Sequence, residues 1–182
     1  MCLIMSNAYM ANKLKPNALQ IMDKAGAIQW DWHIASVDTD IIYSSPELLT
    51  EISNLIVLIF TESSGVDYDA VVGFGENGDI FSKTVAYDSV HRTKRETIKA
   101  IYVKENKKSA FEFYIKEADQ TILQGKKVLI VKDKLMGDAA IQGVVKAVNL
   151  AGGQIIAVAV IYNLLSTTAE EIGVPEIFSL IQ

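Results

Sequence analysis

The stretch that decides the fold is residues 126–140, with the sequence KKVLIVKDKLMGDAA. Its apolar, β-branched run Val128–Val131 predicts a buried strand. A helix is expected directly afterwards, because apolar residues recur at helical spacing from Ile141 to Val148 before Gly152-Gly153 ends the pattern. The loop between them, residues 132–139, would then join the carboxyl end of a strand to the amino end of a helix. In α/β proteins this is where ligands, and phosphates above all, tend to bind.

Strands and helices alternate on both sides of this segment. On its N-terminal side we expect a strand at 70–74, a helix at 80–89 and a strand at 100–103, and on its C-terminal side a strand at 155–162. Alternation of this kind predicts an α/β fold with a mainly parallel sheet flanked by helices. The pattern breaks after residue 104, where apolar and polar residues alternate through 111–115 and predict one further strand.

The first 45 residues predict a small N-terminal unit. Apolar residues at helical spacing in 18–25 indicate a helix that Gly26 ends. Residues 27–43 mix aromatic and β-branched side chains, which predicts two short strands around a turn at 38–40. We therefore expect a single domain, 1–182, with this helix and strand pair in 1–45 and an α/β core in 46–182.

The core is expected to begin with a helix at Ser45-Pro46-Glu47, because Ser is a good N-cap and Pro suits the first helical position. The helix carries an apolar stripe from Leu48 to Ile59, which is a packing face for either the core or a subunit interface. Trp30 and Trp32 are likewise expected either in the core or at a subunit interface. Stacking on a base is a further alternative for them.

Composition and charge argue against several classes of protein. The formal net charge of −5 disfavours nucleic-acid binding. The lone Cys2 permits no intrachain disulfide, and His33 and His91 lack neighbouring ligands, so we predict no metal site. The longest apolar runs are far shorter than the ~20 residues of a membrane helix. We expect a cytoplasmic protein that does not associate with membranes.

The order and spacing of short motifs resemble a known family. From about Asn17 to the end, the matching segments are 23–28 (DKAGAI), 68–73 (YDAVVG), 101–104 (IYVK), the central VLIVKD and 173–175 (GVP). They resemble the type I phosphoribosyltransferases, and among these the orotate phosphoribosyltransferases. The resemblance implies the type I fold with a small N-terminal hood. It also implies a dimeric glycosyltransferase of pyrimidine biosynthesis that uses magnesium to join orotate to 5-phosphoribosyl-1-pyrophosphate (PRPP).

The phosphate loop departs from the family pattern of two acidic residues, two apolar residues and then T-T-G-G-S. Aligned without a gap, Lys132 and Asp133 stand at the acidic pair, and the phosphate cradle is Met136, Gly137, Asp138, Ala139 and Ala140. Only Asp133 keeps its chemical type. Asp138 brings a negative charge to the place of a dianion, where repulsion at about 4 Å is ~1 kcal/mol in water and larger in a desolvated pocket. As an alternative, Asp138 caps the helix itself.

The other loops depart as well. The pyrophosphate turn, A-T-G-G-I-P in the family, contains Glu76, Asn77 and Gly78 here, so it gains a negative charge; a simple turn that caps the next helix is the structural alternative. In the hood, the family's lysine and S-G-R give way to the sequence ASVD at 35–38. Lys104 and Lys108 keep positive charge at matching places, but the segment after them has no glycine before Gly125, and it resembles an ordered strand more than a lid.

Together these changes favour a pseudoenzyme, an orotate-phosphoribosyltransferase-like protein that has lost PRPP binding and catalysis. It would act as a non-catalytic binding or regulatory homodimer, or as partner of an active paralogue, with a nucleotide-type ligand and no required cofactor. The alternative is an active transferase that forms orotidine 5′-phosphate with Mg²⁺, using Asp133 toward the ribose hydroxyls and Lys104 or Lys108 toward the pyrophosphate. A nucleic-acid-binding regulator on the same fold is a third class, which the charge disfavours.

Overall fold

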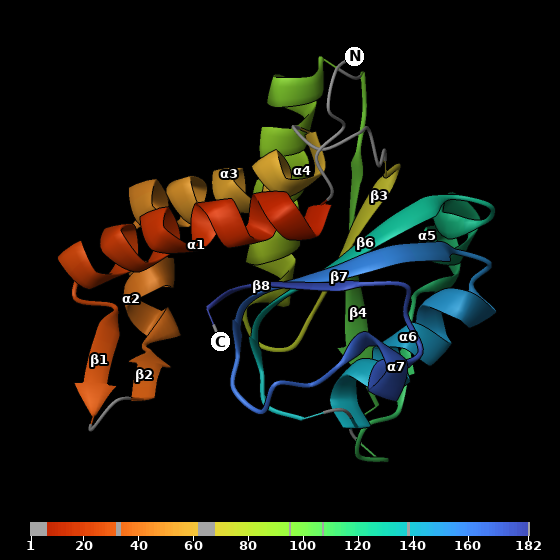
Figure 1. The fold of residues 1–182 in the computed structure, drawn as a ribbon. Coiled ribbons are helices and arrows are strands. Elements are labelled where there is room, and N and C mark those ends of the chain that lie inside the picture. The colour runs from red at the N-terminus through yellow and green to blue at the C-terminus, as the bar shows by residue number, and fades with distance from the viewer. Residues whose placement is uncertain are drawn as a thin grey trace.

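A six-stranded sheet forms the centre of the computed structural model, which describes residues 7–31, 34–61, 68–94, 96–106, 108–137 and 139–181 (Figure 1). The strand order is β5-β4-β3-β6-β7-β8, and every neighbouring pair is parallel except β4 and β5. The strands are β3 (Ala70–Phe74), β4 (Lys99–Glu105), β5 (Phe113–Tyr114), β6 (Lys127–Leu135), β7 (Gln154–Asn163) and β8 (Ile177–Ile181). The predicted α/β class with a mainly parallel sheet is confirmed.

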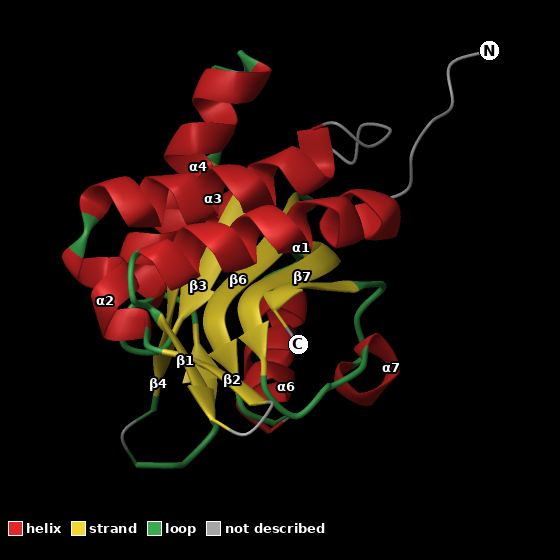
Figure 2. Cartoon of the chain, turned by 60° about the vertical axis from the view of Figure 1, so that its left-hand side comes forward, coloured by secondary structure: helices red, strands yellow, loops and turns green. Residues whose placement is uncertain are grey.

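Helices cover both faces of the sheet (Figure 2). One face carries α1 (Asn7–Lys24), α2 (Thr39–Ser44), α3 (Pro46–Thr61) and α4 (Gly78–Thr93), and the other carries α5 (Glu117–Leu123), α6 (Ala139–Leu150) and α7 (Ala169–Ile172). Successive strand residues feed the two cores in turn, since Leu129 packs under α1, α3 and α4 whereas Ile130 packs under α6. Because both faces of the central strands are buried, their sequences are continuous apolar runs without alternating polar residues.

The N-terminal strand prediction is only partly right, because both observed strands precede the predicted turn and residues 41–43, expected as strand, are helical. Strands β1 (Ile28–Asp31) and β2 (Ile34–Val37) pair antiparallel in a separate two-stranded sheet that projects from the body of the molecule (Figure 1). The turn was expected at 38–40, where the chain instead begins α2. Asp38 is the N-cap, and its carboxylate accepts from Asp40 N–H at 3.0 Å. Asp favours turns and N-caps alike, which is why the pattern was misread.

Strand β6 is longer than its apolar run. A strand at 128–131 followed by a loop over 132–139 was expected, but β6 continues to Leu135 because its pairing with β7 extends to Leu135↔Asn163. Lys132 and Asp133 are therefore strand residues. The connection to α6 shrinks to 136–138, and Asp138 lies outside the described residues.

The strand expected at 111–115 is mostly wrong. Only β5, two residues long, forms there, while Phe111 lies in a turn with a left-handed φ of 61°. The turn is closed by Asn106 N–H, which donates to the carbonyl of Glu112 at 2.7 Å. Helix α5 follows at Glu117 and has no counterpart in the sequence prediction. Alternation over five residues did not distinguish a strand from a turn in which Phe111 and Glu112 are both exposed.

The apolar stripe of α3 belongs to the core of this chain. Ser45 caps the helix as predicted, accepting from Leu48 N–H at 3.2 Å. The stripe packs against neighbouring helices, and Leu48, Ile52, Leu55, Ile56 and Ile59 are all buried. Trp30, by contrast, is 61% exposed, with its indole N–H on Asp23 at 3.2 Å; Trp32 lies outside the described residues. None of the described helices is long and apolar enough to cross a membrane.

Candidate functional site

A cavity of about 520 Å³ lies at the carboxyl ends of β3 and β6. Its size is that of a small-molecule site, and this edge of a parallel sheet is where such sites form. Segments far apart in the sequence meet there, namely the start of α2, the β3–α4 loop, the turn before β5, the end of β6 and the start of α6. The lining residues are Thr39, Asp40, Phe74, Glu76, Asn77, Phe111, Lys132, Asp133, Lys134, Leu135, Met136, Gly137, Ala139 and Ala140.

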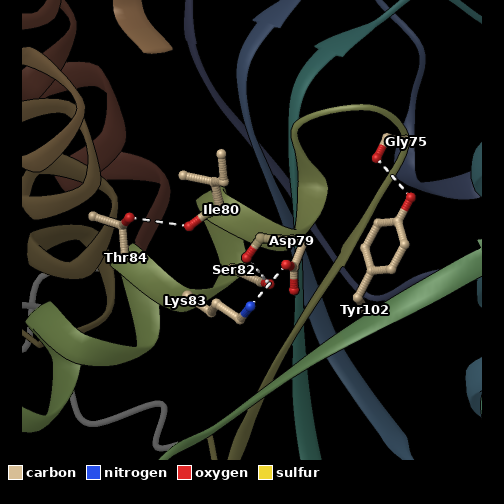
Figure 3. A network of polar contacts seen from close by, with 7 residues as sticks. All are labelled: Gly75, Asp79, Ile80, Ser82, Lys83, Thr84 and Tyr102. Atoms are coloured by element: carbon tan, nitrogen blue, oxygen red, sulfur yellow. Dashed lines mark hydrogen bonds and ion pairs between the residues drawn. The ribbon is translucent and has the colours of Figure 1, made fainter. Parts of the chain in front are cut away.

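The β3–α4 loop, residues 74–77, is held by backbone contacts. A Cβ on Gly73 would lie 1.9 Å from the carbonyl oxygen of Gly78, so the end of β3 touches the start of α4 as only glycine permits. Tyr102, from β4, donates its hydroxyl to the carbonyl of Gly75 at 3.0 Å (Figure 3). The loop thereby presents Glu76 and Asn77 to the cavity.

The polar side chains in the first turns of α4 interact within the helix itself. Asp79 and Lys83 form an exposed ion pair at 2.7 Å, and the hydroxyls of Ser82 and Thr84 donate to carbonyls one turn earlier (Figure 3). Asn77 occupies the N-cap position but makes no side-chain cap hydrogen bond. The capping alternative for this turn is thus only partly met, since no side chain satisfies the first N–H groups of α4 from the N-cap.

At the end of β6, a lysine and an aspartate that adjoin in sequence form an ion pair. Lys132 Nζ lies 2.5 Å from Asp133 Oδ1, which also accepts from Lys134 N–H at 2.7 Å. Asp133 is 6% exposed. The ammonium lies 5.6 Å from the centre of the Phe74 ring and would be 2.8 Å from a Cβ on Gly75. The pair therefore reaches across to the β3–α4 loop and fills part of the space beside it.

Tyr43, on α2, stands beside this pair, and sequence reasoning missed it. Burial and the nearby Asp133 carboxylate raise the pKa of the Tyr43 phenol, so it stays neutral. Its hydroxyl is buried and has no hydrogen-bond partner among the described residues. Edge-on packing against Phe81 at 6.4 Å holds the ring. No spacing signal could have found Tyr43, because α2 is brought to β6 only by the tertiary fold.

The β6–α6 loop is open by comparison. Met136 is 67% exposed, and Gly137 has a φ of 133°, which few other residues adopt. A Cβ on Gly137 would meet only Leu165, at 4.0 Å. Asp138, predicted either to oppose a phosphate or to cap α6, lies outside the described residues.

The structure gathers most of the predicted phosphate and pyrophosphate positions, but not the predicted catalytic lysines. Gly78 is buried behind the cavity as the first residue of α4. Lys104 pairs with Tyr114 in the sheet, and Lys108 lies exposed in the turn before β5, so neither lines the cavity. Sequence reasoning also missed Asp40 and Phe74 as lining residues.

A magnesium ion would find few ligands in this cavity. One oxygen of Asp133 is taken by Lys132, and Asp40 and Glu76 come from separate exposed segments. Within the described ranges, no group of three or more His, Cys, Asp or Glu residues is placed to hold a metal ion. Any magnesium bound here would need ligands from a substrate.

Comparison with solved structures identifies the fold. No protein-family model and no curated protein matches the chain. A phosphoribosyltransferase from Corynebacterium diphtheriae superposes with a TM-score of 0.66 at 22% identity, covering 93% of this chain and 95% of that one. The chain has the type I phosphoribosyltransferase fold.

Enzymes for two different bases share this phosphoribosyltransferase fold with the chain. Orotate phosphoribosyltransferase of Mycobacterium tuberculosis, in complex with inorganic phosphate, has a TM-score of 0.68 at 18% identity and coverage of 94% and 92% of the two chains. Adenine phosphoribosyltransferase of Saccharomyces cerevisiae has a TM-score of 0.64 at 19% identity and coverage of 95% and 99%. The likeness therefore establishes the fold and does not select a base.

Proposed function

We propose that this phosphoribosyltransferase-fold protein is a non-catalytic binding or regulatory protein that does not bind PRPP. The observation that carries the proposal is the Lys132–Asp133 pair. The resemblance puts Asp133 at the carboxylate that serves the ribose hydroxyls, yet one of its oxygens is already bonded to Lys132 Nζ at 2.5 Å and to Lys134 N–H. A ligand that needs the whole carboxylate must first break this partly buried pair.

The phosphate cradle supports the same proposal. Of its described positions, Met136, Gly137, Ala139 and Ala140, none carries a hydroxyl that could donate to a phosphate. Charge-assisted donors are what make phosphate sites strong, and a cradle left with backbone N–H groups alone has lost that contribution. The neighbouring Glu76 and Asp40 carboxylates add repulsion toward a dianion.

Calorimetry with PRPP and Mg²⁺, beside assays of orotate and adenine consumption, tests the proposal. We expect no binding and no turnover; micromolar PRPP affinity or measurable product would contradict it. A loop variant with T-T-G-G-S at 136–140 and Lys132→Asp is the matched gain-of-function arm. It is expected to bind PRPP measurably, because it returns the hydroxyls and frees Asp133.

An active transferase is the second candidate, and two observations favour it. A cavity of small-molecule size lies at the carboxyl ends of the strands, and the Lys134 ammonium at its wall has no partner among the described residues. Lys104 and Lys108 do not reach this cavity from their own chain, so they would have to serve a second subunit. If the transferase is active, Asp133→Asn and Lys108→Ala each lower its turnover sharply while the protein stays folded.

We also propose that the protein is a homodimer or the partner of an active paralogue. Trp30 supports this, because at 61% exposure it is not covered by its own chain. Light scattering on the purified protein measures the assembly, and Trp30→Ser is expected to weaken it. A monomer at micromolar concentration would overturn the homodimer, and the paralogue would then have to be sought as a heterodimer partner.

A further inference from the structure

A second pocket, of about 450 Å³, lies where α3 faces the last turns of α4, and the two helices pack side by side (Figure 2). We call it the α4 pocket, and its lining residues are Asn54, Tyr87, Asp88, His91 and Arg92. No described residue lines both this pocket and the cavity at the end of β6. Helix α4 begins beside that cavity at Gly78 and reaches Tyr87 about 14 Å further along its axis. The two sites are therefore separate.

Asp88 is the buried acid of the α4 pocket. It is 6% exposed, and its Oδ2 has no hydrogen-bond partner among the described residues. Burial raises the pKa of Asp88 to about 6, so the carboxylate is mostly charged at neutral pH. A buried charge without a partner is costly, and a bound group that donates hydrogen bonds removes that cost. The carboxylate therefore favours a ligand with a cationic donor.

Arg92 brings the opposite charge to the rim of this pocket. It is exposed and stands one helical turn after Asp88, a spacing at which ion pairs can form. Within the described part of the chain no ion pair joins the two side chains, and Arg92 acts on Asp88 through its charge alone. A guanidinium is the side chain best suited to a carboxylate. An acid and a base in this arrangement suit a ligand that carries both charges.

The remaining lining residues offer an aromatic surface and an amide. Tyr87 is 64% exposed, and its ring packs edge-on against His91 with the ring centres 4.3 Å apart. Aromatic rings attract both an ammonium group and an apolar side chain. From the facing helix, Asn54 adds an amide that can donate and accept hydrogen bonds. The pocket thus has room and contacts for an organic group beyond the two charges.

We propose that the α4 pocket binds a free α-amino acid, with its ammonium on Asp88 and its carboxylate on Arg92. Its side chain lies over the rings of Tyr87 and His91. Residues one helical turn apart have Cβ atoms about 6 Å apart, so one small molecule can reach both charges. A simple amine would leave Arg92 without a partner, and a simple acid would leave Asp88 without one. The inference goes beyond the proposed function and does not depend on it, because the two sites share no described residue.

Ligand-observed NMR with glycine, L-leucine, L-glutamine and L-phenylalanine tests the inference on the unmodified protein. We expect at least one of the four to bind with a Kd below about 1 mM. Its N-acetyl form lacks the ammonium and its methyl ester lacks the carboxylate, and each is expected to bind at least tenfold more weakly. Absence of binding by all four amino acids overturns the inference, and so does a blocked form that binds as well as the free amino acid.

Variants at both charges locate the binding. Asp88→Asn keeps the shape of the side chain and is expected to lose at least tenfold in affinity, and Arg92→Gln, at an exposed position, at least fivefold. Lys83→Gln is the matched control, because Lys83 is an exposed cation on the same helix but outside the pocket, and it is expected to change nothing. Equal affinities of the Arg92 and Lys83 variants would overturn the placement of the ligand carboxylate.

Discussion

The β3–α4 loop and the β6–α6 loop flank one cavity at the same edge of the sheet, yet they are built in opposite ways. The first is held by the contact between Gly73 and Gly78 and by the hydroxyl of Tyr102. The second has an exposed Met136 and a Gly137 that touches little. The difference teaches that one cavity can be bounded by a loop whose conformation is fixed by backbone contacts and by a loop whose side chains make few contacts.

The contact at Gly73 is the strictest test of this comparison. Gly73→Ala would push a methyl group to within 1.9 Å of a backbone oxygen, and we expect a loss of about 3 kcal/mol or more in the free energy of unfolding. Urea denaturation measures it. Gly125→Ala is the control, because an added Cβ would meet nothing within 4 Å there. Its left-handed φ of 71° disfavours alanine, and we expect a loss of only about 1 kcal/mol from this strain. Similar losses at both sites would refute the account of the loop as sterically closed.

The helices that follow the two loops should differ in their response to pH. Burial raises the pKa of Asp88, on α4, from 3.8 to about 6, although His91 and Arg92 act to lower it. Between these pH values the folded protein binds the proton and the unfolded chain releases it. The free energy of unfolding therefore falls as pH rises from about 4 to about 6, by about 2 to 3 kcal/mol, and the loss is complete above that.

Asp88→Asn checks the pH prediction by removing the titrating group. Urea midpoints at several pH values between 4 and 7 are expected to show a smaller decline in the variant than in the parent protein. The buried face of α6 is entirely apolar, with Ile141, Val144, Val145, Ala147 and Val148, so it adds no such dependence. An unchanged decline in the variant would place the titration elsewhere.

The Lys132–Asp133 pair lies beside the closed β3–α4 loop, and removing its cation should destabilise that side of the cavity. Lys132→Met removes the ammonium near the Phe74 ring and leaves Asp133 with one hydrogen bond, and we expect a loss of about 2 kcal/mol. Adding Asp133→Asn should recover part of this loss, because no buried charge then lacks a partner. Strictly additive effects in the double-mutant cycle would mean that the two side chains do not interact.

Tyr102→Phe removes one hydrogen bond from the closed loop. The carbonyl of Gly75 loses its 3.0 Å donor, and we expect a loss of about 1 kcal/mol by thermal or urea unfolding. The ring of Tyr102 is retained, so packing is not altered. A neutral result would show that water replaces the hydroxyl at no cost.

The smallest effect is expected in the open loop. Met136→Ser changes a side chain that is 67% exposed, and the free energy of unfolding should change by less than about 0.5 kcal/mol. A loss above 1 kcal/mol would mean that the open loop is packed against something, and the contrast between the two loops would fail.

The pattern of apolar residues was enough to predict most elements but not their ends. The helix start at Ser45 and the strand at 70–74 were predicted correctly, because capping and continuous apolar runs are local signals. The extension of β6 to Leu135 could not be foreseen, since its last residues are charged and are held by pairing with β7. The turn at Phe111 was misread as a strand, because alternation over five residues does not show whether a partner strand is available for pairing.

The amino-acid sequence by itself determined the α/β architecture, the position of a candidate site at the end of β6 and the absence of hydroxyl side chains at 136–140. These follow from periodicity and residue type, which act over a few neighbours. Only the tertiary structure decided that Lys132 turns to Asp133, that Tyr43 and Phe111 join the site, and that the α3 stripe is core. Such contacts join segments far apart in the chain, and their partners are set by packing in three dimensions.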